Sequence, residues 1–481
     1  MNKDKFLEIT SYIGEITKGT EFEHHIYAVG GSVRSLVMGR EIKDIDLVID
    51  IPEGGVRFAQ WCKDNGYTGG VVMYPTYGTA MFRFGKFPDD EIECVMTRGE
   101  KYTDAGSRNP TVEFTSLKDD ALRRDLTINA LYYDISKKEI LDPTGFGIED
   151  IENKICRVPM EVKCKDFNRR YMQNNIDYTF ISDPLRILRC IRFSCRFGFE
   201  ISEKTYESMK RNVDRLSIIT VERINDELCK ILMSKDAHHG IMLINDIGAM
   251  KYVIPELEKT IGLGQNAYHF GDVWVHTMAV LENDCNLFEP DLICRLAALL
   301  HDIGKIGCRT EKDGKVHFYG HEDIGADIAR EALRRLKFDN HTIDEVCFII
   351  KNHMRAKGFE NDCHKMKDKA ANKFMYVCGT RERFGRVCRV IEDDNLAHER
   401  NHCITGQYAA FMECADKSKM FGYKLPIDGN DMMEGLGIGP GPAVKEVLKG
   451  VMAHAFNNPD ITRESCMKIM KGVFRNINKT K

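Results

Sequence analysis

Two aspartates, Asp44 and Asp46, stand one residue apart and follow a glycine pair, Gly30 and Gly31. Because alternate side chains of a β-strand share a face, both carboxylates would point in the same direction. Neighbouring anions repel each other unless a hard divalent cation lies between them, and Mg²⁺ prefers oxygen ligands that substrate phosphates complete. The glycines would let the backbone approach a triphosphate, and Arg34 in a following helix would attract the anion. A tight turn followed by a solvated strand end is the alternative interpretation.

This grouping of acids suits nucleotidyl transfer. Two metal ions roughly 3.5–4 Å apart can activate an attacking hydroxyl and neutralise the leaving pyrophosphate. Glu93, in the alternating segment 91–97, could support the metals from a neighbouring strand. Asp89, Asp90 and Glu91 lie close to it in the sequence, so the choice among these acids stays open.

A second polar segment, RRDLTINAL at residues 123–131, combines two arginines with an aspartate and an asparagine. Arg123 and Arg124 could contact phosphates. Asp125 could accept a hydrogen bond from a ribose hydroxyl, and Asn129 could donate one to a sugar or a phosphate. The alternative is a capped helix start with a surface arginine pair.

The segment DPLRILRCIRF, residues 183–193, predicts an amphipathic helix. Asp183 and Arg186, three residues apart, would be neighbours on one helix face. A carboxylate beside a guanidinium can pair with the edge of cytosine or adenine, whereas uracil or guanine would leave groups unpaired at roughly 1–3 kcal/mol each. An ordinary surface ion pair is the alternative. The helix would bury Leu185, Leu188 and Ile191. It would also carry a positive stripe of Arg189, Arg192 and Arg196. These arginines could follow RNA phosphates or simply cover the helix face.

The elements that must position these side chains change character along the chain. Short apolar or alternating runs predict strands at residues 25–31, 44–50, 78–84 and 91–97, which would form a mixed sheet with covering helices. After about residue 150, long amphipathic segments predict mostly helices, so the expected fold class is α+β. At roughly 150 residues per domain, the 481 residues predict three or four domains. We place the domains at residues 1–155, 156–262, 263–400 and 401–481.

The composition excludes several classes of protein. With 43% hydrophobic and 30% charged residues, the chain has no apolar run long enough to cross a bilayer, and its first ten residues carry charge where a secretory signal needs apolar residues. The 17 cysteines show no paired spacing, which is typical of reduced thiols in the cytoplasm. The net charge is only -4, so a nucleic-acid partner would need a local basic surface.

Together, these motifs resemble the bacterial-type (class II) tRNA nucleotidyltransferase and poly(A) polymerase family over most of the first half of the chain. The resemblance implies a polymerase-beta-like catalytic domain in which Asp44 and Asp46 bind Mg²⁺. It implies template-independent addition of the 3′-terminal CCA to tRNA from CTP and ATP. It also implies that RRDLTINAL distinguishes ribose from deoxyribose and that Asp183 and Arg186 choose the base.

The family pattern also identifies departures and alternatives. Ser35 stands where aspartate is common, and Ser182 stands where glutamate is common. The polar segment 98–114 resembles the family's flexible loop, whose presence goes with addition of both C and A, and ERINDELCKIL, with Arg223 and Glu227, resembles a motif of structural role. Three alternatives stay open: a poly(A) polymerase, an enzyme that adds only CC or only A, and a phosphohydrolase whose N-terminal half only binds.

A second constellation, which includes the segment AALLHDIGK, resembles the HD phosphohydrolase superfamily. Imidazole and carboxylate ligands suit divalent transition metals such as Mn²⁺, Fe²⁺ or Ni²⁺ as well as Mg²⁺. Such a site could hydrolyse a phosphomonoester or a 2′,3′-cyclic phosphate at an RNA end, or the domain could be a helical scaffold for tRNA. For the last ligand, Asp393 is adjacent to the preferred Asp394. The ligands that this resemblance implies are His276, His301, Asp302, His321, His353 and Asp394.

The carboxyl region resembles the tail of bacterial family members. Lys445, Lys449 and the basic segment 470–481 could contact tRNA. A solvated helix face is the alternative.

Overall fold

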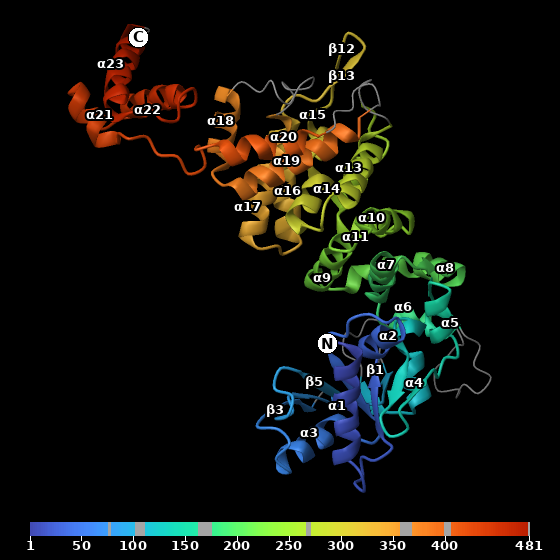
Figure 1. Cartoon of the computed structure of the whole chain (residues 1–481). Coiled ribbons are helices and arrows are strands. Elements are labelled where there is room, and N and C mark those ends of the chain that lie inside the picture. The colour runs from blue at the N-terminus through green and yellow to red at the C-terminus, as the bar shows by residue number, and fades with distance from the viewer. Residues whose placement is uncertain are drawn as a thin grey trace. The chain divides into compact units, whose positions relative to one another are not determined.

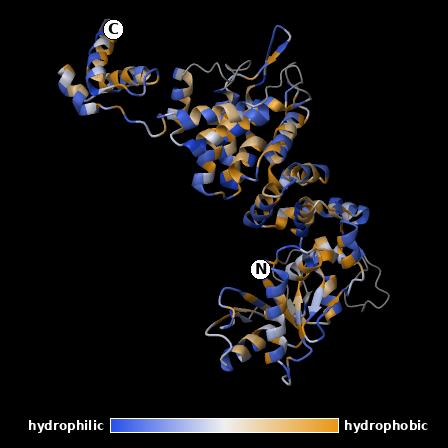
Figure 2. Cartoon of the chain, in the orientation of Figure 1, coloured by the Kyte–Doolittle hydropathy of each residue, from blue (hydrophilic) through white to orange (hydrophobic). Residues whose placement is uncertain are grey.

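The computed structural model of the chain describes residues 1–75, 78–101, 111–161, 176–265, 271–355, 368–398 and 406–479. The chain divides into two compact units, Met1–Val253 and Ile254–Lys481 (Figure 1). The first unit contains the sheet, and the described part of the second is helical apart from a short hairpin, which confirms the predicted α+β class. Figure 2 shows that the helices mix hydrophilic and hydrophobic residues, and within the described ranges every helix is too short or too polar to traverse a bilayer.

A seven-stranded mixed sheet forms the centre of the first unit. Strands β2 and β5 run parallel, and the other neighbouring strands run antiparallel. All four predicted strands are present, as β1, β2, β4 and β5. In sheet order the strands are β3 (Val71–Tyr74), β4 (Thr79–Phe82), β5 (Ile92–Met96), β2 (Ile45–Ile49), β1 (Ile26–Val29), β8 (Tyr132–Asp134) and β9 (Glu139–Leu141).

The two faces of this sheet are covered unequally. Helices α1 (Lys3–Ile16) and α3 (Gly54–Asp64) pack on one face, where they contribute Phe6 and Phe58 to a large apolar core. The opposite face carries a smaller core that includes Val48 and Tyr132. Because side chains two residues apart on a strand share a face, Asp46 lies on this second face with Val48. The polar end of that face is therefore available for chemistry.

Short helices and two strand pairs complete the first unit. Helices α7, α9 and α10 pack against one another and form its helical part. α7 ends at Gly198, whose φ of 70° suits the left-handed cap that glycine favours. The strand pairs are β6 (Arg98–Lys101) with β7 (Thr111–Phe114) and β10 (Ile155–Cys156) with β11 (Glu200–Ile201). The helices are α2 (Gly31–Val37), α4 (Leu117–Leu122), α5 (Gly147–Glu152), α6 (Tyr178–Ser182), α7 (Arg186–Phe197), α8 (Glu203–Asn212), α9 (Val221–Leu232), α10 (Ala237–Asp246) and α11 (Met250–Val253).

The second unit begins with a helical bundle and ends with a smaller helical cluster. The final three helices have their own apolar core, which includes Met432, Val451 and Met470. The hairpin consists of β12 (Thr310–Lys312) and β13 (Lys315–His317). The helices are α12 (Pro255–Glu258), α13 (Val273–Leu287), α14 (Leu292–Leu300), α15 (Lys305–Cys308), α16 (His321–Arg335), α17 (Asn340–Asn352), α18 (Asp368–Cys378), α19 (Arg381–Leu396), α20 (Gln407–Lys417), α21 (Gly429–Leu436), α22 (Pro442–Ala455) and α23 (Arg463–Lys479).

Candidate active site and metal centre

Three predicted carboxylates gather at the same end of two central strands. In the parallel pairing of β2 with β5, Asp46 lies directly opposite Glu93. Asp44 immediately precedes β2. Asp90, one of the alternative acids, is instead paired with Lys5 at 2.7 Å. The strand register therefore favours Glu93 as the third acid beside the aspartate pair.

The charge on this cluster is unfavourable without a cation. Asp46 is half-buried, whereas Asp44 and Glu93 are exposed. Burial, reinforced by the neighbouring Glu93, raises the pKa of Asp46 to about 6, and Arg124 partly opposes the shift. A carboxylate that resists ionisation, as Asp46 does, is stabilised when a hard divalent ion binds it. The donor set thus fits Mg²⁺.

The glycine turn before α2 faces these carboxylates. Gly30 has φ 71° and ψ -125°, a conformation that side-chain-bearing residues rarely adopt. A Cβ atom placed there would lie 3.5 Å from Nη1 of Arg124 and 3.9 Å from Oδ2 of Asp46. The backbone therefore approaches Asp46 closely, and the role of this turn beside a triphosphate stays a prediction.

The arginine pair of RRDLTINAL is held by an aspartate that sequence reasoning missed. Asp120 is fully buried in α4 and accepts hydrogen bonds from Arg123 (2.6 Å), Arg124 (3.0 Å) and the Tyr132 hydroxyl (2.6 Å). Although burial alone would raise the pKa of Asp120, the two guanidinium groups keep it below its ordinary value. The spacing of three and four residues was the signal that could have identified this acid.

Asp125 links the same segment to helix α7. Its Oδ2 accepts hydrogen bonds from Nε and Nη2 of Arg189, at 2.9 and 2.5 Å. Its Oδ1 accepts from Nδ2 of Asn129 and from the backbone of Leu126, both at 2.9 Å. Asn129 in turn accepts from Arg34. Both oxygens of the carboxylate that we expected to accept a hydrogen bond from a ribose hydroxyl thus already accept from protein donors.

The predicted pairing of Asp183 with Arg186 on one helix face is wrong. Asp183 has an extended backbone between α6 and α7 and accepts a hydrogen bond from Arg223, at 3.1 Å. The cause is Pro184, because a residue before proline avoids the helical conformation. Arg186 begins α7 and donates to the Ser182 hydroxyl at 3.0 Å, and also to the Thr179 carbonyl. Ser182 therefore still supports the arginine at the position where the family commonly has glutamate.

The expected positive stripe on α7 is interrupted. Arg192 is buried and donates to Glu227 of α9 at 2.6 Å, so its charge is neutralised within the protein. Arg189 is partly exposed and Arg196 is exposed. The predicted apolar side is confirmed, since Leu185, Leu188 and Ile191 are all buried.

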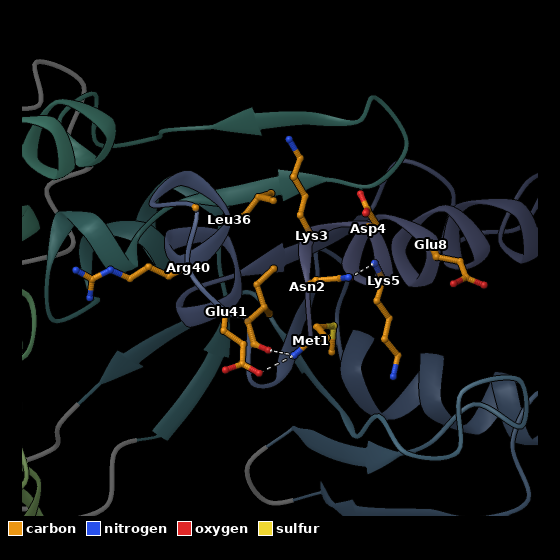
Figure 3. Close-up of a pocket in the computed structure, with 11 residues that line it drawn as sticks. Met1, Asn2, Lys3, Asp4, Lys5, Glu8, Leu36, Arg40 and Glu41 are labelled. Atoms are coloured by element: carbon orange, nitrogen blue, oxygen red, sulfur yellow. Dashed lines mark hydrogen bonds and ion pairs between the residues drawn. The ribbon is translucent and has the colours of Figure 1, made fainter. Parts of the chain in front are cut away.

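A cavity of about 980 Å³ lies elsewhere on the first unit (Figure 3). The amino-terminal nitrogen at its wall donates to the Ile42 carbonyl and lies 3.7 Å from Glu41. None of the predicted site residues lines this cavity, so it gives no support to the proposed chemistry. The residues around it are Met1, Asn2, Lys3, Asp4, Lys5, Glu8, Leu36, Gly39, Arg40, Glu41 and Ile42.

The second unit brings its predicted ligands together. Their ligand atoms form two groups, each with atoms within 4.8 Å of one another, and Asp302 belongs to both. Asp394 joins the first group through a 2.9 Å contact with Nε2 of His276, whereas burial, reinforced by the nearby Asp284 carboxylate, raises the pKa of its neighbour Asp393. All of these side chains are buried. The first group is His276, His301 and Asp302, and the second is Asp302, His321 and His353.

Three of the imidazoles are oriented by backbone carbonyls. Nδ1 lies 2.8 Å from the Ala298 carbonyl in His301, 2.8 Å from the Phe318 carbonyl in His321, and 2.6 Å from the Ile350 carbonyl in His353. A carbonyl can only accept, so each Nδ1 carries the proton and each Nε2 is left as a ligand atom. Burial lowers the pKa of His353 to about 3, which keeps that ring neutral. The donor set fits a divalent transition metal.

Two further residues of the HDIGK segment shape this centre. A Cβ atom on Gly304 would lie 2.0 Å from the His321 carbonyl, so only glycine lets this turn contact the start of α16. Lys305 is buried, with its Nζ 2.5 Å from Oδ2 of Asp302 and 2.6 Å from Oε1 of Gln265. Sequence reasoning missed Lys305, although its place three residues after Asp302 was a signal.

Some predictions concern residues near the limits of the described ranges. The core of the expected flexible loop, residues 102–110, lies outside the described residues, while β6 and β7 flank it. In the tail, Lys445 and Lys449 are exposed on α22, and residues 480–481 lie outside the description.

Sequence profiles of three known domains match successive parts of the chain. The Poly A polymerase head domain matches residues 26–157, and the probable RNA and SrmB-binding site of polymerase A matches residues 198–261. The HD domain matches residues 272–373. The matched ranges cover the carboxylate cluster and most of the metal ligands.

Curated relatives and solved structures extend this comparison. A multifunctional CCA protein of Neisseria meningitidis is 31% identical over 337 residues, 68% of this chain and 72% of the relative. One from Actinobacillus pleuropneumoniae is 30% identical over 356 residues, 71% of this chain and 77% of the relative. A CCA-adding enzyme of Bacillus stearothermophilus, solved with CTP, has a TM-score of 0.67 at 22% identity over 99% of both chains. The Thermotoga maritima CCA-adding enzyme, solved with tRNA, has a TM-score of 0.60 at 21% identity over 98% of this chain and 96% of that one.

Proposed function

The chain belongs to the family of the multifunctional CCA proteins and is a tRNA nucleotidyltransferase, and we propose that it adds the 3′-terminal CCA to tRNA from CTP and ATP. The observation that carries the residue assignment is the register of β2 with β5, in which Asp46 lies opposite Glu93 while Asp44 immediately precedes β2. The glycine turn at Gly30 supports the assignment, because it faces these acids.

In this reaction the 3′ hydroxyl of the tRNA attacks the α-phosphorus of the nucleotide, and the bond to pyrophosphate breaks. Mg²⁺, when bound by Asp44 and Asp46, supplies charge neutralisation and activates the hydroxyl. Glu93 adds an acceptor at the same strand end. Arg124, which is close to both Gly30 and Asp46, adds positive charge where the triphosphate would lie, and Asp120 fixes its guanidinium in place.

Base choice is assigned to Asp183 and Arg186, which act from separate elements and not as a helical pair. Arg223 holds the Asp183 carboxylate, and Ser182 holds the Arg186 guanidinium. A carboxylate accepts from an exocyclic amino group, and a guanidinium donates to a ring nitrogen or carbonyl. The link from Arg189 to Asp125 keeps α7 and the catalytic segment in register.

Incubation of the purified protein with labelled tRNA that lacks its last three nucleotides tests this function. With CTP and ATP together we expect two C residues and then one A. Long A tails would favour a poly(A) polymerase, and arrest after CC, or addition of A only to tRNA that already ends in CC, would favour a partial enzyme. Asp44→Ala should abolish addition but leave tRNA binding, whereas Asp50→Asn, at the far end of β2, should stay active.

A second activity is favoured by the ligands of the second unit. The proposal is that this centre binds a divalent transition metal and hydrolyses a phosphomonoester or 2′,3′-cyclic phosphate at an RNA end. Two buried ligand groups that share Asp302 support it, because a helical scaffold for tRNA needs no such arrangement. A metal bound there would supply an activated water. Burial lowers the pKa of His353 and keeps that ring neutral, and backbone carbonyls orient His301, His321 and His353.

Hydrolysis of a short RNA that ends in a 2′,3′-cyclic phosphate, assayed with added Mn²⁺ or Ni²⁺, tests the second activity. His301→Ala should abolish hydrolysis and leave CCA addition intact. His341→Ala, which changes an exposed histidine of α17, is the matched control. An inactive wild-type protein under every metal would favour the scaffold.

The domain roles and location are part of the same proposal. Residues 1–155 would carry catalysis, 156–262 base recognition, 263–400 the metal centre and 401–481 tRNA contact through Lys445 and Lys449. A cytoplasmic location is supported by buried free thiols such as those of Cys94, Cys190 and Cys388, which fit a reducing compartment.

A further inference from the structure

The β12–β13 hairpin comes just before α16, whose first residue is the candidate metal ligand His321 (Figure 1). In its antiparallel register, Lys312 lies opposite Lys315 and Thr310 lies opposite His317. Side chains that are directly opposite, or two residues apart on a strand, share a face. One face therefore carries both lysines and the histidine, while Glu311 and Val316 lie on the other.

The aromatic part of this face is stacked and open to solvent. The rings of His317 and Tyr319 lie 5.2 Å apart at an interplanar angle of 9°. Tyr319 is 76% exposed, the most exposed of the large apolar or aromatic side chains that the structure describes. An exposed aromatic ring held flat by a second ring is a surface on which a nucleic-acid base can stack.

The charges nearby favour an anionic partner. Lys312 and Lys315 are exposed and flank Asp313 and Gly314 in the turn, and the ion pair recorded among the described residues of this hairpin is that of Arg309 with Glu311. Glu311, the acid on the opposite face, lies 3.7 Å from Arg309. Two exposed lysines, with one acid, Asp313, in the turn between them, leave a net positive charge next to the stacked rings, and this combination can bind the phosphates and bases of single-stranded nucleic acid.

The hairpin is connected directly to the metal ligands. Tyr319 precedes His321 by two residues, so their Cα atoms are at most about 7 Å apart. Phe318 lies between the two stacked residues in the sequence, and its carbonyl orients His321. The Phe318 ring lies 5.5 Å from the Lys305 ammonium, and that ammonium pairs with Asp302. One ribose separates a base from its phosphate, so a base on Tyr319 would bring that phosphate within reach of the centre.

We propose that the hairpin face of Lys312, Lys315, His317 and Tyr319 binds the terminal nucleotide of a single-stranded RNA 3′ end, with the base stacked on Tyr319 and the terminal phosphate directed to the metal centre. The proposal rests on the second activity above and names its substrate class. Hydrophobic residues of a protein partner would not require the two lysines, so an RNA end fits the face better.

Crosslinking on the full-length protein tests the proposal. A single-stranded RNA octamer with a 3′-terminal 4-thiouridine and a 3′-phosphate is irradiated with the protein, and the attached peptide is identified by mass spectrometry. We expect attachment within residues 309–320. Tyr319→Ala should reduce the yield about tenfold, Tyr319→Phe should retain at least half of it, and Glu311→Gln, on the other face, should match the wild type. Attachment only elsewhere, or an unchanged yield with Tyr319→Ala, would overturn the proposal.

A kinetic readout separates this proposal from the hydrolase activity on which it rests. Tyr319→Ala should raise KM about tenfold for the octamer with a 2′,3′-cyclic end but leave hydrolysis of glycerol 2-phosphate, which has no base, unchanged. Equal loss on both substrates would overturn the stacking role. If the wild type hydrolyses neither substrate, the hydrolase proposal fails while the crosslink still decides where the RNA end binds. Competition by free uridine 3′-monophosphate as strong as by the octamer would overturn the assignment to RNA.

Discussion

The two candidate metal sites are built in opposite ways. At the nucleotidyltransferase site, Asp44 and Glu93 are exposed at the end of an open sheet. At the second centre, the side chains are buried, and backbone carbonyls orient three of the rings. An open carboxylate cluster leaves coordination positions for a substrate triphosphate, whereas a closed imidazole-rich set retains a metal between turnovers. We therefore expect a metal at the exposed carboxylates to arrive with its substrate and a metal at the buried ligands to stay bound in the protein.

The largest effect is expected from removal of Asp46 at the nucleotidyltransferase site. Asp46→Ala should lower the rate of CCA addition by at least about a thousandfold, as expected when electrostatic stabilisation of the transition state is lost. Hydrolysis at the second centre should be unchanged. Initial rates of both reactions on the same preparation give the result, with Asp50→Asn as the control. Substantial residual addition would remove Asp46 from the metal site.

The next effect concerns metal content at the closed centre. Asp302→Ala removes a ligand from both groups, so purified protein should lose all bound transition metal by elemental analysis. His353→Ala removes a ligand from one group only and should lose about half of the metal. An Asp302→Ala protein that retains the full wild-type metal content would contradict the assignment of Asp302 to both ligand groups.

A smaller effect, on the free energy of unfolding, is expected from removal of Asp120, the buried partner of Arg123 and Arg124. Asp120→Ala leaves the guanidinium groups of Arg123 and Arg124 without their buried partner and should reduce the free energy of unfolding of the first unit by about 3–5 kcal/mol. Asp64→Asn, which changes an exposed acid in α3, should alter it by less than about 0.5 kcal/mol. Urea denaturation followed by circular dichroism measures both. Equal stability of the two variants would show that the buried network contributes little.

The smallest effect is expected for Arg186, through the preference for CTP over UTP. Arg186→Ala should reduce the preference for CTP over UTP about tenfold, which corresponds to about 1.4 kcal/mol. Arg223→Ala should reduce it less, because Asp183 remains and only its orientation is lost. Competition between labelled CTP and UTP measures the ratio, and Arg211→Ala, an exposed pair partner of Asp177, is the control. Unchanged discrimination in Arg186→Ala would refute its role.

The sequence predicted short-range features better than long-range partners. Alternation identified the strands that carry Asp46 and Glu93, but their register depends on pairing between segments 47 residues apart, which one sequence leaves open. The helical pairing of Asp183 was wrong because the effect of Pro184 was overlooked, and that signal was present in the sequence.

Partners that depend on tertiary packing could not be predicted in the same way. Arg192 meets Glu227 only because α7 packs against α9, and Asp125 meets Arg189 across 64 residues. In contrast, Asp120 lies within one helical turn of the arginines that it binds, so local spacing could have revealed it. The metal ligands were predictable as a set because their family resemblance, and not their spacing, placed them together.

Asp302 contributes to both ligand groups of the second unit, and this has a consequence for how the centre fills. Two ions that share one carboxylate cannot load independently. If each group held an ion, the first ion would order the Asp302 carboxylate and add positive charge near the second group, so the second ion would meet a better-ordered ligand but a stronger electrostatic repulsion. The titration curve for metal uptake should therefore depart from that of two separate sites, and its shape reports which of these opposing effects is larger.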